Sequence, residues 1–454
     1  MSSPRSVASL SHGTGKRTLQ QQRSEAVQEE KKKQPWAVGK NAALFAFFVV
    51  VLPTVMILAG VSHTPAAAAT RLGWTMLGTF TARGAVQKRA EENNRCDTSV
   101  GRWVREPSVP AYTAATCPTL PDSKNCRKYG KDPGHLYWRW RPDGGCDLPR
   151  PSPARFLAAV RGKRLAFIGD SLARNQMESL LCLLSQAEAP TKVSADDDGV
   201  REWRFPAHGF TLMAITTRFL ARAEEVLGGD GRPTASFDVH LDAPDPVWAS
   251  RHLRELDYAV FSTGNWFFRV NYFSEGGRRV ACSGCSGDAD AGELADFGVA
   301  HAVRRVVRAA LEATARCGSC KRGLVAFVRT YTPSHFEHGS WFDGGYCNRT
   351  RPLEEDEAPS WDQSIGWDVR RAQIEEVTSA RKTTTTTRFE VLDVTKAMML
   401  RADGHPGRHY DKRSAGGGAN DCLHWCIPGP IDMWNDVLLH KIAETASPPA
   451  TNLR

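Results

Sequence analysis

The stretch RLAFIGDSLARNQMESLLCLLS, residues 164–185, decides the fold class of this 454-residue chain. Its first six residues form an apolar run typical of a buried strand, and the run leads directly into Gly169-Asp170-Ser171. After the serine, apolar residues recur at the spacing of one helix face: Met177, Leu180, Leu181 and Leu184. A strand followed at once by an amphipathic helix predicts an α/β fold.

Three further apolar runs predict buried strands at 257–262, 324–329 and 389–394. An apolar stripe through residues 303–311 predicts a helix between the first two of these runs. Strands that alternate with helices predict a mostly parallel sheet covered by helices on both faces. The acidic run 354–357, the threonines 383–387 and the glycines 416–418 are expected to be solvated loops.

The N-terminal part of the chain predicts a membrane anchor. Residues 1–41 are polar, predicted to be disordered, and carry eight Lys/Arg against three Glu. Residues 42–61 contain no charge over twenty positions, about the length of a membrane-spanning helix. The basic residues before this segment place the short tail in the cytosol and the rest of the chain in the lumen. A cleaved signal peptide is the alternative, although the polar leader is long for one.

The remaining chain is expected to have four parts. Residues 62–95 are predicted to be a stem, and 96–153 a loop-dominated segment rich in Cys, Pro, Gly and Trp. Residues 154–445 are predicted to be the α/β catalytic domain, with a short tail at 446–454. The net charge of +9 does not predict nucleic-acid binding, because no basic-aromatic module or zinc-finger spacing accompanies it.

Twelve cysteines all follow residue 95, and in an oxidising lumen an even number predicts disulfides. They are Cys96, Cys117, Cys126, Cys146, Cys182, Cys282, Cys285, Cys317, Cys320, Cys347, Cys422 and Cys426. The two Cys-x-x-Cys motifs, 282–285 and 317–320, could instead form a four-thiolate zinc site. Because the lumen favours oxidation, we expect no metal.

Ser171 is a candidate nucleophile because it follows a strand and opens a helix. Ligands of open α/β folds bind at that edge, and free N–H groups there can stabilise an oxyanion. The alternative is that Ser171 only caps the helix. A reactive serine also needs a base and an orienting carboxylate, which His424 and Asp421 in DCLHWC (421–426) could supply.

The pair His424–Asp421 alone could be a structural hydrogen bond, but together with Ser171 it favours catalysis. A Gly-Asp-Ser motif early in the chain and Asp-x-x-His late resembles the SGNH/GDSL hydrolase fold. Cys422 and Cys426 are predicted to anchor the loop that carries the base, since small displacements of a catalytic group are costly.

Several motifs follow in order: CDTSVGRWV, WRWRPDGGCDLPR, the stretch around Ser171, RTYTPSHFEHGSWFDGGYCNRTRP, LDVTKAMMLRADGHPGRHY and DCLHWCIPGPIDMWNDVLL. Through them the region from Cys96 to about Ile442 resembles the plant trichome birefringence-like family of polysaccharide O-acetyltransferases. The resemblance implies a single-pass type II Golgi membrane protein with an SGNH-like core. It implies a triad of Ser171, His424 and Asp421 that acts through an acetyl-serine. It also implies the disulfides 96–146, 117–182, 126–426 and 347–422.

The motifs CSGC, CGSC, PDSKNC and HWCIPGP look most like the xyloglucan acetyltransferase branch, whose acceptor is side-chain galactose. Glucomannan- or xylan-specific transferases and a carbohydrate acetylesterase are alternatives, and a non-catalytic wall-polysaccharide binder is the least favoured. We therefore expect a hemicellulose partner and an acetyl donor, acetyl-CoA or another carrier, with no bound cofactor. The sequence does not identify the donor or the oligomeric state.

Five further residues are candidates for the oxyanion or acceptor site: Gly169, Gly264, Asn265, Arg174 and Asn175. Position 265 is more often His or Gln in this branch, and the residues at 174 and 175 could instead brace the helix.

Other residues match family motifs without a clear catalytic role. Trp138 and Trp140 could stack on sugars, although packing is the favoured interpretation, and no role is assigned to His335 and His405. Asn348 opens a glycosylation sequon next to Cys347, where crowding could prevent modification.

Overall fold

The computed structural model describes residues 96–446, except for 109, 147, 151, 196–198, 286–293, 359–362 and 412–419. The predicted cytosolic tail, membrane anchor and stem lie outside the described residues, as do the glycines 416–418. None of the helices in the described ranges has the length and apolar character that a membrane span requires.

A seven-stranded sheet forms the centre of the fold, in the order β14-β13-β9-β3-β6-β5-β4. Its strands are β3 (Arg164–Gly169), β4 (Thr191–Ala195), β5 (Val200–Phe205), β6 (Phe210–Thr216), β9 (Tyr258–Ser262), β13 (Val325–Arg329) and β14 (Arg388–Leu392). The five strands from β14 to β6 are parallel, and the four predicted ones are among them, so this part of the prediction is confirmed. The antiparallel edge pair β4–β5 was not anticipated.

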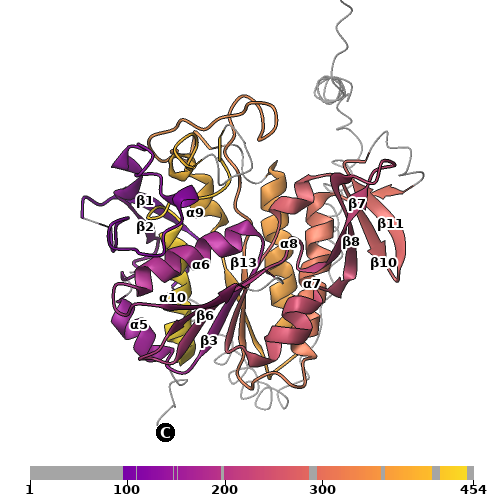
Figure 1. Ribbon diagram of the computed structural model, residues 1–454, viewed down its shortest axis with the longest axis horizontal. Coiled ribbons are helices and arrows are strands. Elements are labelled where there is room, and N and C mark those ends of the chain that lie inside the picture. Colours follow the sequence, from indigo (N-terminus) through magenta and orange to yellow (C-terminus); the bar gives the residue numbers. More distant parts are fainter. Residues whose placement is uncertain are drawn as a thin grey trace, which may run out of the picture. The chain divides into compact units, whose positions relative to one another are not determined.

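Helices cover both faces of this sheet, as the alternating pattern predicted (Figure 1). One face carries α5 (Pro153–Ala159), α6 (Ser171–Leu184) and α10 (Asp432–Ala446), and the other carries α7 (Val299–Ala315) and α8 (Ile365–Ala380). In β3, Leu165 and Phe167 pack on the first face, whereas Ala166 and Ile168 pack on the second. Each fully buried large apolar side chain stabilises the fold by roughly 1.5–3 kcal/mol, so both faces hold the strand in register.

A second, five-stranded sheet was not predicted, and the expectation of a single mostly parallel sheet was wrong here. Its order is β12-β11-β10-β8-β7, with mixed parallel and antiparallel pairs. The strands are β7 (Ala221–Leu227), β8 (Pro233–Pro244), β10 (Asn271–Glu275), β11 (Arg278–Ser283) and β12 (Ala295–Asp296). Phe237, Val239 and Phe273 share a core with α7, which lies between this sheet and the central one (Figure 1).

The segment that precedes the α/β core contains a two-stranded ribbon, which the expectation of a loop-dominated segment did not include. β1 (Gly101–Arg105) pairs antiparallel with β2 (Trp138–Pro142), which places Trp103 opposite Trp140. Short helical turns complete the connections: Asp122–Lys124, Pro133–Leu136, Val247–His252, Leu253–Glu255, Asn265–Phe268, α9 (Thr395–Met399) and Ala402–Gly404.

All twelve cysteines are paired. The structure has the disulfides 96–146, 117–182, 126–426 and 347–422, the same pairs that the family resemblance implies. The motifs 282–285 and 317–320 each close on themselves, so these sulfurs are not thiolate ligands of a shared zinc site.

Candidate active site

Ser171 is the first residue of α6, directly beyond the carboxyl end of β3. The residue before it caps the helix: Asp170 Oδ1 accepts the N–H of Leu172 at 2.9 Å. The capping interpretation of Ser171 is therefore wrong, because a neighbouring carboxylate satisfies the helix terminus. The Ser171 side chain is left partly exposed and able to make other contacts.

The turn before the serine depends on Gly169. Its φ is +154°, and a Cβ placed there would lie 2.0 Å from the carbonyl oxygen of Ser262 in β9. Only glycine permits this close approach of the two strand ends. Because the Gly169 carbonyl accepts the N–H of Thr217 at 2.8 Å, this residue shapes the turn through its backbone.

The three residues predicted as a triad lie in hydrogen-bond contact. The Oγ of Ser171 donates to His424 Nε2 at 2.7 Å, across 253 positions of sequence. The Nδ1–H of His424 donates to Asp421, 2.9 Å from Oδ2 and 3.1 Å from Oδ1. Asp421 Oδ1 also accepts the backbone N–H of His424 at 2.9 Å, which fixes the turn between them. This is the geometry of a serine activated by an oriented imidazole.

Asp421 is held as a carboxylate by its surroundings. Burial alone would raise its pKa, but His424, the Lys124 ammonium and hydrogen bonds from His424 hold the pKa well below its usual range. Lys124 Nζ lies 3.2 Å from Asp421 Oδ2, and its side chain is only 9% exposed. Sequence reasoning missed Lys124, although it stands two residues before Cys126, which the family resemblance pairs with Cys426.

Asn175 connects the helix of the serine to the loop of the histidine. Its Oδ1 accepts the backbone N–H of Trp425 at 2.8 Å, and its Nδ2 donates to the carbonyl of the same residue at 3.2 Å. Both groups are buried. Asn175 therefore fixes the position of the residue that follows His424, rather than providing an oxyanion contact.

Two imidazoles, one buried and one half-buried, support the same loop. His405 Nδ1–H donates to the backbone carbonyl of His424 at 2.7 Å, and His335 Nδ1 lies 2.7 Å from His405 Nε2. The His405 ring stacks on Trp425 with 4.0 Å between centroids. Burial lowers the pKa of both histidines, which favours neutral rings in this apolar setting. The sequence assigned no role to either residue.

The other oxyanion candidates differ in placement. Gly264 and Asn265 follow the end of β9, the strand next to β3, so they lie at the same edge as Ser171. Within the described residues no hydrogen bond engages the N–H of Ser171 or of Gly264, so both could stabilise an oxyanion. Asn265 Nδ2 has a long contact of 3.5 Å with Thr332, and Arg174 lies 3.7 Å from Glu178 along α6.

A buried arginine is the last residue of β13, the strand next to β9. Arg329, at the end of β13, is 2% exposed, donates to Ser262 Oγ and stacks on Trp434 with 4.4 Å to the ring centroid. Burial lowers its pKa to about 10, and the nearby Asp170 partly offsets that effect. The sequence signal was a charged residue at the end of the apolar run 324–329.

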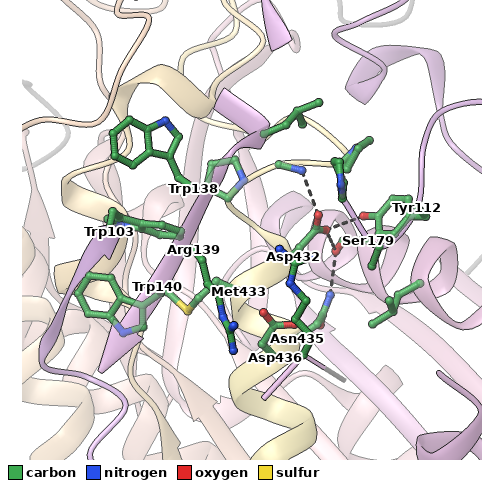
Figure 2. Close-up of a pocket in the computed structure, with 18 residues that line it drawn as sticks. Trp103, Tyr112, Trp138, Arg139, Trp140, Ser179, Asp432, Met433, Asn435 and Asp436 are labelled. Carbon is green, nitrogen blue, oxygen red and sulfur yellow. Dashed lines mark hydrogen bonds between the residues drawn. The ribbon is translucent and has the colours of Figure 1, made fainter. Parts of the chain in front are cut away.

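The tryptophans considered as sugar contacts line a small cavity (Figure 2). Trp140 is buried, donates its indole N–H to Thr98 and packs edge-on against Trp103. Trp138 is half-buried at the same cavity, whose volume of about 90 Å³ is well below the roughly 300 Å³ of small ligand pockets. Packing is thus the better interpretation. Asn348 of the sequon is exposed, as glycosylation requires.

Comparison with family models gives two matches. Residues 94–147 match the model described as the PMR5 N terminal domain. Residues 148–441 match the model described as a GDSL/SGNH-like acyl-esterase family found in Pmr5 and Cas1p.

Named relatives align over most of the chain. Xyloglucan O-acetyltransferase 3 of Populus trichocarpa is 45% identical over 77% of this chain and 86% of its own length. Xyloglucan O-acetyltransferase 4 of the same species is 46% identical over 78% of this chain and 82% of its own length. Xyloglucan O-acetyltransferase 2 of Arabidopsis thaliana is 42% identical over 77% of this chain and 83% of its own length.

Proposed function

Since the chain belongs to the GDSL/SGNH-like acyl-esterase family, and within it to the trichome birefringence-like proteins of the xyloglucan branch, we propose that it is a polysaccharide O-acetyltransferase. Its acceptor is a hemicellulose, and specifically the galactose side chains of xyloglucan. The observation that carries this proposal is the contact of 2.7 Å between Ser171 Oγ and His424 Nε2 at the carboxyl edge of the sheet.

The first half of the reaction forms an acetyl-serine. Ser171 Oγ attacks the carbonyl carbon of the acetyl donor while His424 Nε2 takes the hydroxyl proton. Asp421 stabilises the imidazolium, and we assign the N–H groups of Ser171 and Gly264, which make no hydrogen bond within the described residues, to the oxyanion. The bond between the acetyl group and the donor then breaks, and the leaving group takes the proton from His424.

The second half transfers the acetyl group to a sugar. A hydroxyl of the acceptor gives its proton to His424 and attacks the acetyl carbon, and Ser171 leaves and regains a proton from His424. The chemistry requires an acetyl donor, acetyl-CoA or another carrier, and no bound cofactor. We place the reaction in the Golgi lumen, because the cysteine pairs suit an oxidising compartment.

The test is acetyl transfer by the full-length protein with an aryl acetate as donor and a xyloglucan oligosaccharide as acceptor. Mass spectrometry should detect acetylated oligosaccharide with the wild type, and Ser171→Ala should lower the rate by about a thousandfold or more. Ser185→Ala, just beyond the other end of α6, is the matched control and should retain the rate.

Transfer that persists in Ser171→Ala would contradict the proposed nucleophile. Acetate release that is unaffected by the oligosaccharide, without acetylated product, would instead identify an acetylesterase. Parallel reactions with glucomannan and xylan oligosaccharides determine the acceptor, and we expect xyloglucan to be acetylated fastest.

A further inference from the structure

The exposed Phe and Trp side chains among the described residues gather in one place. They are Phe268, Trp341 and Phe342, with exposed fractions of 44%, 55% and 61%. Together with Arg269 we call them the aromatic platform. Clusters of exposed apolar side chains mark interaction sites, whereas single exposed apolar residues are common on protein surfaces.

The platform is connected at two points to the chain segments of the candidate active site. Phe268 ends the turn that follows β9, and β9 pairs with β3 so that Ser262 lies opposite Gly169. Trp341 and Phe342 lie in a loop closed by the pairing of Glu337 with Tyr346.

That loop is attached to the segment of the catalytic base. The N–H of His335 donates to the carbonyl of Cys422 at 3.0 Å, and Asn420 Nδ2 donates to the carbonyl of Gly345 at 3.1 Å. Both parts of the platform are therefore fixed relative to the chain segments that hold Ser171 and His424.

Arg269 holds the two parts together. Its guanidinium lies 4.4 Å from the ring centroid of Trp266 and 4.8 Å from that of Trp341, so it is stacked between two indoles. Within the described residues its side chain makes no ion pair with a carboxylate and donates no hydrogen bond. Its N–H donors are thus available to hydroxyl oxygens of a ligand.

We propose that the aromatic platform binds the sugar chain of the polysaccharide acceptor and positions its hydroxyl groups toward Ser171. The inference rests on the proposed function and extends it to the recognition of the acceptor. The aliphatic C–H faces of sugar rings pack on the exposed aromatic side chains, and ring hydroxyls accept hydrogen bonds from Arg269. The charged member of the platform, Arg269, is stacked between aromatic rings, and the neighbouring Arg218 stacks on the same Trp266 at 5.1 Å. Both guanidinium groups carry N–H donors that suit the hydroxyl groups of a neutral glycan.

The experiment compares Trp341→Ala/Phe342→Ala with Leu227→Ala, which removes an equally exposed apolar side chain (59%) from β7. Binding to xyloglucan is measured by affinity gel electrophoresis with each change placed in the Ser171→Ala protein, so that no turnover occurs. We expect at least a tenfold loss of affinity for the double variant and none for Leu227→Ala. Trp341→Phe, which keeps an aromatic ring, should restore much of the affinity.

A second readout is the KM of the active protein for acceptors of different length. The double variant should raise the KM for an oligosaccharide of many sugar units far more than the KM for a single galactoside. A structural defect would affect both acceptors alike. Unchanged binding, or a KM increase independent of acceptor length, would overturn the platform as a glycan site. A loss of self-association or of liposome binding in its place would identify a protein or membrane contact instead.

The two proposals fail separately. If the wild type binds xyloglucan through the platform but transfers no acetyl group, the proposed function is wrong and the platform stands. If it transfers acetyl groups and the double variant binds and reacts as the wild type does, the platform is wrong and the function stands.

Discussion

At the scale of single residues, the position of His424 depends on contacts made by its neighbours. Asn175 holds the backbone of Trp425 by two hydrogen bonds, and the His405 ring donates a hydrogen bond to the backbone carbonyl of His424. On the side chain, Asp421 orients the imidazole and is itself paired with Lys124. The contact between Ser171 and His424 is thus supported by residues from four separate parts of the chain.

Asn175→Ala tests this positioning role. The change leaves a buried N–H and a buried carbonyl of Trp425 without partners, at a cost of about 1–3 kcal/mol. Because the loop can then shift, we expect kcat to fall by about a hundredfold, with a small change in KM. The rate at which a fluorophosphonate labels Ser171 should fall in parallel.

Gln176→Ala is the matched control for Asn175. Gln176 is equally buried in α6 but contacts Asn435 of α10 rather than the loop of His424. It should lower the melting temperature while the labelling rate is retained. Equal loss of labelling in both variants would show that α6 acts only through overall stability.

At the scale of elements, α10 carries two carboxyl groups in surroundings that disfavour their ionised form. Burial raises the pKa of Asp432 to about 6, and burial together with the charge of Asp432 raises the pKa of Asp436 to about 7. Asp432 accepts hydrogen bonds from Tyr112 and Ser179, whereas Asp436 lines the cavity beside Arg139 (Figure 2). In the unfolded chain both carboxyls titrate near pH 4.

These two shifts predict a contribution to stability that grows as the pH falls from about 7 to about 4. In that window Asp432 and Asp436 bind more protons in the folded state than in the unfolded state, so their contribution to the free energy of unfolding rises as pH decreases. Asp436→Asn should raise the melting temperature at pH 8, by on the order of 1 kcal/mol of stability, and the gain should vanish below about pH 4.

Thermal unfolding monitored by circular dichroism between pH 4 and 8 measures this effect. Asp368→Asn, on the surface of α8, is the control and should not change the pH dependence. A melting temperature of Asp436→Asn that follows the wild type at every pH would contradict the prediction.

The elements also show what sequence patterns can and cannot predict. The runs 164–169 and 324–329 are buried on both faces, so they read as continuous apolar strands and were predicted correctly. β7 and β8 belong to a sheet with an exposed face, and in ARAEEVL charged residues interrupt the apolar ones, so no continuous apolar run indicates a strand. The strands of that sheet were therefore missed.

The same limit applies to the candidate site. Ser171, His424 and Asp421 stand in local motifs that carry recognisable chemistry, and the structure brings them together. Lys124 has no such local signal, and Asn175 was a candidate for a different role, because the contacts of both depend on which distant segment packs against them. Tertiary contacts of this kind become visible only when the fold is known.

At the scale of the whole molecule, disulfides connect the segment before the α/β core to the two elements of the candidate site. Cys117 is bonded to Cys182 of α6, and Cys126 is bonded to Cys426, two residues beyond His424. The segment matched by its own family model is therefore joined covalently to the helix that begins with Ser171 and to the loop of His424.

Cys126→Ser/Cys426→Ser should show this dependence. The bond joins residues 300 positions apart, and its loss should cost about 2–4 kcal/mol of stability. Acetyl transfer should fall at least tenfold even at temperatures where the protein remains folded, because the loop of His424 and its partner Lys124 lose a covalent connection.

The control is Cys317→Ser/Cys320→Ser, which removes a bond between residues three positions apart beyond the end of α7. Transfer rate and melting temperature, measured side by side, should be nearly unchanged in this variant. If both pairs of substitutions reduced the rate equally, the connection to the catalytic loop would not be the cause.

The wide separation of residues 171 and 424 has a consequence for biosynthesis. Chains emerge from the ribosome amino end first, so the strand and helix around Ser171 can form long before His424 has been added to the chain. Under the proposed mechanism, a nascent chain, or one cut short by a stop codon after residue 420, lacks the base that activates Ser171. The acetyl-serine could then form only after translation of the last few dozen codons.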